Sequence, residues 1–195
     1  MDNLHPVHQH QDGFFNTVSG RKIDLNNPTG QMINISDIAH GLAHICRFGG
    51  HTQHYYSVAQ HSILVMKLAP QHLKFAALMH DAPEAYLGDV IKPLKNIIGT
   101  AYTDIEHKFE TLICERFGVS QEDVKAIKPY DKEAIEIEHE YFFKGRMHAF
   151  TREFGPMYFW RPEEACRNFI HWFYNLNTYD NITPFGDLRK EAHHG

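Results

Sequence analysis

Residues 73–87 read LKFAALMHDAPEAYL, an apolar segment that runs into an adjacent histidine and aspartate, His80 and Asp81. The apolar spacing before this pair is helical, and Pro83 has no backbone N–H to donate, so one helix stops there or another begins. Asp81 is predicted to cap the next helix, with Glu84 three residues later as its capping-box partner. The stretch therefore predicts two short helices that meet at a His-Asp pair.

The same helical spacing of apolar residues recurs along the rest of the chain. We expect helices over about residues 36–46 with Ser36 as N-cap, from Val58 to near Pro70, from Ile105 to Gly118, around Val124 after the cap Ser120 and up to Pro129, from the cap Asp131 through Phe142, and from Pro162 through Leu176. Strand patterns are scarce, apart from a small hairpin over residues 14–25 with a Ser19-Gly20 turn. The sequence thus predicts an all-α fold, a single bundle of six to eight helices with a small N-terminal β-hairpin.

Length and composition are those of one globular domain. The chain has 195 residues, with 43% hydrophobic and 22% charged residues, a balance typical of folded rather than disordered proteins. We expect a tail and hairpin over residues 1–30, the helical domain over residues 31–180 and a C-terminal tail over residues 181–195.

Charge and cysteine content disfavour several classes of protein. Nineteen Lys and Arg against 24 Asp and Glu leave no basic surplus for a nucleic-acid backbone, so a duplex binder is not expected. No apolar run approaches the 18–20 residues of a membrane helix, so no membrane partner is expected. Three cysteines, odd in number and far apart, favour a reducing cytoplasmic location over a disulfide scaffold.

A dispersed set of side chains is the candidate metal site: His61, His80, Asp81 and Asp131. Each lies on or at the end of a predicted helix, and helix ends brought together in a bundle can supply ligands to one centre. Two imidazoles and two carboxylates suit Mn, Fe, Co or Zn better than Mg. Taken singly, each of the four is better explained without a metal, Asp81 and Asp131 as helix caps and His80 as an exposed or satisfied histidine. The apolar run before His80 favours the metal, because a buried His-Asp pair needs a partner.

Four motifs in this order resemble the HD-domain metal-dependent phosphohydrolase superfamily. They are SVAQHS at residues 57–62, HDAPEA at 80–85, GDVIKPLK at 88–95 and DK at 131–132. The resemblance covers roughly residues 33–143 and is closest to the branch of bacterial 5′-deoxynucleotidases and small phage-type deoxynucleoside triphosphohydrolases. It implies an all-α fold with one divalent transition metal (Mn, Co, Fe or Zn) held by His61, His80, Asp81 and Asp131.

The resemblance also places two carboxylates, Glu84 and Asp89, beside the attacking water. On a helix that continues from the His80-Asp81 pair, Glu84 would lie on the same face as the pair and could act as general acid or base. A capping-box role for Glu84 and a turn-forming role for Asp89 remain as competing interpretations.

The expected substrate-binding residues are basic or aromatic. By resemblance, Arg47 holds phosphate with its planar fork and Lys95 matches a basic residue of the family, whereas Phe48 stands where the family often has Trp. Lys92 is as readily a solvated lysine. His51 and His54 could contact phosphate or help bind a second metal, or they could be ordinary loop residues.

Together these features predict a divalent-metal-dependent phosphohydrolase acting on deoxynucleotides. A monophosphate and a triphosphate substrate both remain open. Two other classes also remain, a non-catalytic metal- or nucleotide-binding regulator and a purely structural helical domain. We further expect a homo-oligomer, because the aromatic segments at residues 158–160 and 169–174 offer apolar surface and the family is usually oligomeric.

Overall fold

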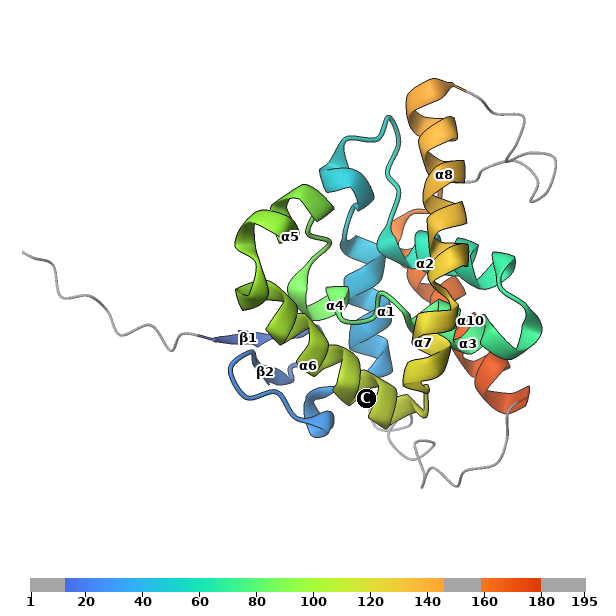
Figure 1. The fold of residues 1–195 in the computed structure, drawn as a ribbon. Coiled ribbons are helices and arrows are strands. Elements are labelled where there is room, and N and C mark those ends of the chain that lie inside the picture. The colour runs from blue at the N-terminus through green and yellow to red at the C-terminus, as the bar shows by residue number, and fades with distance from the viewer. Residues whose placement is uncertain (1–12, 146–158, 180–195) are drawn as a thin grey trace, which may run out of the picture.

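Most of the chain is helical, with a two-stranded hairpin at one edge (Figure 1). The computed structural model describes residues 13–145 and 159–179. The predicted all-α class with a small N-terminal hairpin is confirmed. Three predicted segments lie wholly or partly outside the described residues: residues 1–12 of the N-terminal tail, all of the C-terminal tail at residues 181–195, and Tyr158 of the aromatic segment.

In chain order, the strands are β1 (Phe14–Asn16) and β2 (Lys22–Asp24), and the helices are α1 (Ile35–His44), α2 (Val58–Leu68), α3 (Lys74–Met79), α4 (Glu84–Leu87), α5 (Lys92–Ile98), α6 (Thr100–Phe117), α7 (Gln121–Ala126), α8 (Lys128–Lys144) and α10 (Pro162–Tyr179). Short 3₁₀ helices occupy Gly30–Met32, Arg47–Gly50 and Gln71–Leu73. No helix in the described parts of the chain is both long and apolar enough to cross a bilayer.

The hairpin forms as predicted and is held to α1 by one carboxylate. β1 and β2 pair antiparallel with Phe15 opposite Ile23, and Gly20 supplies the positive φ of the turn, +80°. Asp37 on α1 accepts hydrogen bonds from the Thr17 hydroxyl at 2.9 Å and from the Ser19 amide at 3.0 Å. These bonds fix the turn against the bundle.

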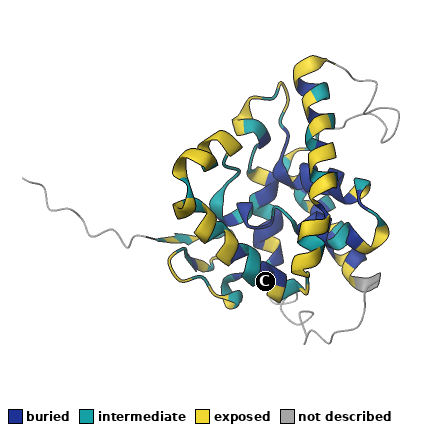
Figure 2. Cartoon of the chain, in the orientation of Figure 1, coloured by how far each residue is buried: buried dark blue, intermediate teal, exposed yellow. Residues whose placement is uncertain are grey.

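The core lies between α1, α2, α3 and α10. α1 packs against α10, α4 and α2, and α10 also covers α2 and α3. Figure 2 shows α1, α2 and α3 largely buried, whereas α5 and the outer side of α8 are exposed. Phe169 and Ala165 of α10 are fully buried, as the predicted apolar face of that helix requires. The bundle thereby holds α2, α3 and the start of α8 side by side.

Several predicted helix boundaries are correct, whereas the cap predicted for the first helix is wrong. Ser120 caps α7 by accepting from the Asp123 amide at 3.0 Å, and α10 begins at Pro162. For α1, however, the N-cap is Asn34 rather than Ser36. The Asn34 side chain accepts from the Ser36 amide at 2.8 Å, which places Ser36 inside the helix.

The capping roles predicted for the two aspartates are also wrong. α4 begins after Pro83 without a side-chain cap, so the Asp81 carboxylate caps nothing there. α8 begins at Lys128, with Pro129 in its first turn, and Asp131 lies inside the helix. Proline fits a first turn because its missing N–H would be unpaired there in any case. Both carboxylates are therefore available for other contacts.

Helix α5 was not predicted. It is short, it contains no buried residue, and Ile97 is 82% exposed. Its apolar side chains do not form a face buried against the core. Their spacing therefore lacks the amphipathic pattern by which a helix is predicted. α5 nevertheless matters for the site because it carries Lys95.

We predict that Gly41→Ala destabilises the fold. A Cβ at Gly41 would lie 2.9 Å from the backbone oxygen of Ala85 and 3.0 Å from its Cβ, so α1 and α4 could not keep their present separation. Steric strain should outweigh the gain in helix propensity and lower the free energy of unfolding by about 1–2 kcal/mol net. Urea unfolding followed by circular dichroism measures this, and a variant as stable as the parent would contradict the close α1–α4 contact.

Candidate metal centre and anion-binding site

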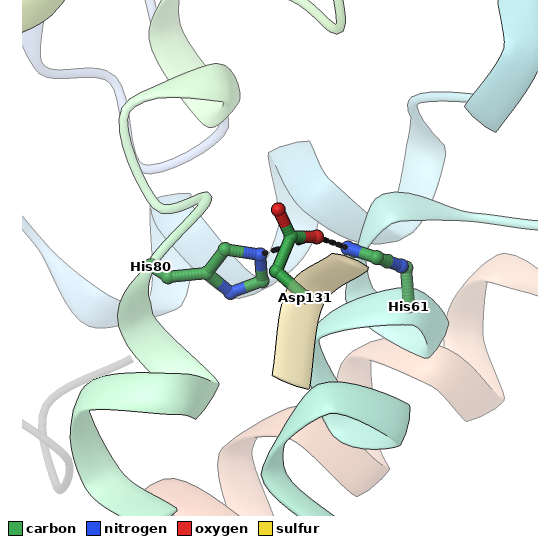
Figure 3. A group of neighbouring side chains, drawn as sticks. All are labelled: His61, His80 and Asp131. Carbon is green, nitrogen blue, oxygen red and sulfur yellow. Dashed lines mark hydrogen bonds and ion pairs between the residues drawn. The ribbon is translucent and has the colours of Figure 1, made fainter. Parts of the chain in front are cut away.

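Three helices bring together three of the predicted ligands. His61 comes from α2, His80 follows the last residue of α3, and Asp131 lies in the first turn of α8. Figure 3 shows the Asp131 carboxylate between the two imidazoles. Its Oδ1 is 3.1 Å from His61 Nε2 and 3.7 Å from His80 Nε2. One ligand atom from each of the three residues lies within 4.8 Å of the others.

The fourth predicted ligand, Asp81, joins the same cluster. Its Oδ2 is 3.2 Å from His80 Nε2 and 3.5 Å from His61 Nε2. Donor atoms about 2.0–2.2 Å from a shared cation lie about 2.8–3.6 Å apart when neighbouring bonds meet at right or tetrahedral angles. The four imidazole–carboxylate distances, 3.1, 3.2, 3.5 and 3.7 Å, are close to that range. The Asp131 side chain is 33% exposed, so the cluster is open to solvent on one side.

Both histidines use Nδ1 for a structural hydrogen bond. His61 Nδ1 donates to Glu138 Oε1 at 2.6 Å, and His80 Nδ1 donates to the Ala77 carbonyl at 2.8 Å. A carbonyl can only accept, so His80 carries its proton on Nδ1. His80 Nε2 is buried without an aligned hydrogen-bond partner, although Asp81 is close. Metal-ligating histidines have this arrangement, in which the second nitrogen fixes the ring. The donor set therefore fits a divalent cation.

The side chains of the cluster shift one another's pKa values. Burial alone would lower the pKa of His80, but the negative charges of Asp81 and Asp131 raise that pKa well above its usual value. Burial alone would raise the pKa values of Asp81 and Asp131, yet the two histidines hold both well below the ordinary range. Both carboxylates are thus ionised at neutral pH, as cation ligands must be.

Sequence reasoning missed one residue of the site, Glu138. It is fully buried on α8 and accepts hydrogen bonds from His61 Nδ1 and, at 2.7 Å, from the Tyr56 hydroxyl. Its other oxygen pairs with Arg47 Nη2 at 3.3 Å. Glu138 follows Asp131 by seven residues, two helical turns, so the two share a face of α8. That spacing is the signal that could have identified it.

Arg47, the predicted phosphate ligand, lies beside the cluster. Its guanidinium is buried, with Nη1 3.8 Å from Asp81 and 3.9 Å from Asp89. Burial opposes the charged form, but Glu138 and the two aspartates outweigh it and raise the pKa of Arg47. Next to it, Phe48 has a φ of +54°, a strained conformation for an aromatic residue, and its ring packs against α8.

The two carboxylates predicted to handle protons, Glu84 and Asp89, also lie near Arg47. Burial, followed by the negative charge of Asp81 and Asp89, raises the pKa of Glu84 to about 9. Lys95 Nζ is 3.7 Å from Glu84 Oε1 but only 2.6 Å from Glu106 Oε1. Because the lysine is hydrogen bonded to Glu106, it does not hold Glu84 ionised. Burial likewise raises the pKa of Asp89, against the opposing charge of Arg47.

Three of the predicted substrate residues are not brought into the cluster. Lys92 is exposed at the start of α5. His51 and His54 are also exposed, and the His54 ring packs on Phe159 at 4.5 Å between centroids. Within the described ranges, none of the three has an ion pair or hydrogen bond to the four candidate ligands.

A small pocket adjoins the cluster on the side of Glu84. Its volume is about 150 Å³, and it is lined by His80, Asp81, Pro83, Glu84, Lys95, Glu106 and Glu110. Pockets that enclose a drug-sized ligand measure roughly 300–1,000 Å³. This pocket would therefore enclose only part of a nucleotide, such as a phosphoryl group.

We predict that the stability of the chelator-treated protein falls between pH 5 and 8 because of Glu84. The folded-state pKa of about 9 exceeds the unfolded value, so the folded state retains a proton that the unfolded state releases in this range. The wild type should lose up to about 1.4 kcal/mol per pH unit relative to Glu84→Gln, which has no proton to release. Thermal unfolding of both proteins at several pH values measures this. Parallel pH profiles would show that Glu84 is ionised in the folded protein.

We also predict that Mn²⁺ stabilises the protein through His80. A cation that binds only the folded state, at 100 times its Kd, raises the free energy of unfolding by about 2.7 kcal/mol. Thermal unfolding with and without Mn²⁺ should show this shift in the wild type and lose it in His80→Ala. His107→Ala is the matched control, because that imidazole is 70% exposed on α6. An equal shift in His80→Ala would place the cation elsewhere.

Comparison with known proteins finds relatives that are themselves named as uncharacterized proteins. No protein-family model matches the chain. The uncharacterized protein YfdR of Escherichia coli is 44% identical over 106 residues, which are 54% of this chain and 59% of YfdR, so the chain spans less than two thirds of that relative. The uncharacterized protein RCAP_rcc00048 of Rhodobacter capsulatus is 41% identical over 136 residues, 63% of this chain and 69% of that protein. The chain belongs to the same family as RCAP_rcc00048.

Proposed function

We propose that this chain is a divalent-metal-dependent phosphohydrolase of the HD-domain type that acts on nucleotides, in particular deoxynucleotides. The observation that carries the proposal is the orientation of His61 and His80. Each ring is fixed through Nδ1, and each Nε2 is directed at the carboxylates of Asp81 and Asp131. The sequence resemblance to HD-domain phosphohydrolases supports the same conclusion.

The position of Arg47 supports an anionic substrate. Its Nη1 faces Asp81 and Asp89, so a phosphoryl group bound near the cluster would meet a guanidinium already in place. Arginine offers a planar fork that matches phosphate oxygens, and a buried guanidinium stabilises the charge of a phosphoryl-transfer transition state. Lys95 adds a second positive charge at the adjoining pocket.

Each residue then has a defined chemical task. His61, His80, Asp81 and Asp131 would hold the cation, which when bound polarises a phosphoryl oxygen and acidifies water. Water adds to phosphorus and the bond from phosphorus to the leaving oxygen breaks. Glu84, protonated at neutral pH, gives its proton to that oxygen, and Asp89 accepts the proton from water.

The wider setting is part of the same proposal. We place the enzyme in the cytoplasm, where its three cysteines, free in the structure, would stay reduced. We also expect a homo-oligomer, because α5 exposes Leu94 and Ile97 together with the adjacent Ile91.

The activity is tested by incubating the protein with each deoxynucleoside mono- and triphosphate in Mn²⁺ or Co²⁺ and separating the products by chromatography. A 5′-nucleotidase would release nucleoside and phosphate, and a triphosphohydrolase would release nucleoside and triphosphate. Stoichiometric cation binding without turnover of any nucleotide would contradict the proposal and favour a regulatory metal- or nucleotide-binding domain.

We predict that Glu84→Gln lowers kcat by roughly 10²–10⁴-fold, because the amide keeps the shape of the protonated acid but donates no proton to the leaving oxygen. Cation affinity should not change, since Glu84 is not one of the four ligands. Steady-state kinetics measure the first effect and calorimetric titration with Mn²⁺ the second. Glu122→Gln, an exposed change on α7, is the control. Unchanged turnover would remove Glu84 from the mechanism.

A further inference from the structure

The Glu138 carboxylate divides its two oxygens between two parts of the site. Oε1 accepts from His61 Nδ1 at 2.6 Å and from the Tyr56 hydroxyl at 2.7 Å. Oε2 accepts from Arg47 Nη2 at 3.3 Å. All four side chains are buried, and Glu138 itself has no exposed surface. An ionised group in such a place is costly unless every contact is satisfied, and here each oxygen has a donor.

The Arg47 guanidinium is divided in the same way. Nη2 is bound to Glu138 at 3.3 Å, whereas Nη1 faces Asp81 and Asp89 at the longer distances of 3.8 and 3.9 Å. The contact with Glu138 is therefore the shortest of the three, and it holds the Arg47 side chain in place. The Nη1 edge is the part directed toward the cluster, where it could exchange its distant aspartates for a phosphate oxygen.

We propose that Glu138 is a positioning residue that holds His61 for the cation and Arg47 for the phosphate with a single carboxylate. This inference rests on the proposed function for the identity of the anion. Glu138 touches neither substrate nor cation. It fixes the His61 ring with Nε2 toward the cluster, and it keeps the guanidinium beside the cluster when Asp81 is engaged with a cation.

Substitution with glutamine separates this role from packing. In Glu138→Gln the amide oxygen can still accept from Tyr56 and His61, so size and fold are retained. The amide N–H₂, however, faces the guanidinium of Arg47, and the negative charge on the His61 hydrogen bond is lost. The matched control is Glu136→Gln, the same chemical change on α8 at an exposed position.

The experiment measures two affinities of the full chain, Mn²⁺ for the chelator-treated protein and inorganic phosphate for the Mn²⁺-loaded protein, both by calorimetry. Glu138→Gln should weaken Mn²⁺ by about 10–100-fold, as loss of a metal ligand's outer partner does. It should also weaken phosphate by about tenfold through the loss of a charged hydrogen bond. Glu136→Gln should match the wild type, and Arg47→Lys should weaken phosphate alone.

The outcomes are decisive in either direction. A folded Glu138→Gln protein with wild-type Mn²⁺ affinity, or one that behaves like Arg47→Lys, overturns the inference. Neither titration needs turnover. If the wild type hydrolyses no nucleotide while Glu138→Gln still weakens both affinities, the proposed function fails and the positioning role stands.

A measurement on the wild type covers the case in which Glu138→Gln does not fold. In histidine-labelled, Zn²⁺-loaded protein, the nitrogen-15 spectrum should show a His61 Nδ1–H that is protected from exchange with solvent, because that proton is held by Glu138. A His61 ring that binds Zn²⁺ through Nδ1, or an Nδ1–H that exchanges freely, would contradict the role assigned to Glu138.

Discussion

The hydrogen bond from His61 to Glu138 joins the fold to the site. His61 has no exposed surface, and an imidazole so placed must satisfy both ring nitrogens within the protein. Nδ1 is satisfied by Glu138 on α8, and Nε2 faces Asp131 on the same helix. The packing of α2 against α8 is therefore polar at its centre. The same contacts that position these two helices also orient the candidate ligand.

The all-α class was readable from the sequence because the apolar residues of the buried helices recur with a helical period. The hairpin was readable from its Ser19-Gly20 turn, and α10 from Pro162 at its start. α5 was not, because it buries none of its residues and so has no apolar face to detect. Apolar residues recur with a helical period where one face of a helix is buried, so a helix that buries no face lacks this pattern.

The four predicted ligands lie close together in the structure, yet the capping roles predicted for two of them were wrong. Asp81 and Asp131 occupy positions where a helix cap and a metal ligand require the same residue type, so local spacing could not separate the two. Only the long-range contacts do, since both carboxylates face the imidazoles rather than backbone amides. Glu138 was not predicted, for a related reason. A glutamate in a helix usually lies at the surface, and the partners that keep this one buried come from other parts of the chain.

Four carboxylates of the candidate site differ more in their surroundings than in their chemistry. Asp81 and Asp131 face two imidazoles, which lower the pKa of each and keep both charged. Glu84 and Asp89 are buried near like charges, and the pKa of each is raised. When the pKa values of titratable groups in one site differ in this way, the chemical roles of the groups follow from their environments. The ionised pair suits a cation, and the pair with raised pKa values suits proton transfer. His61 and His80 set the first condition, and burial sets the second.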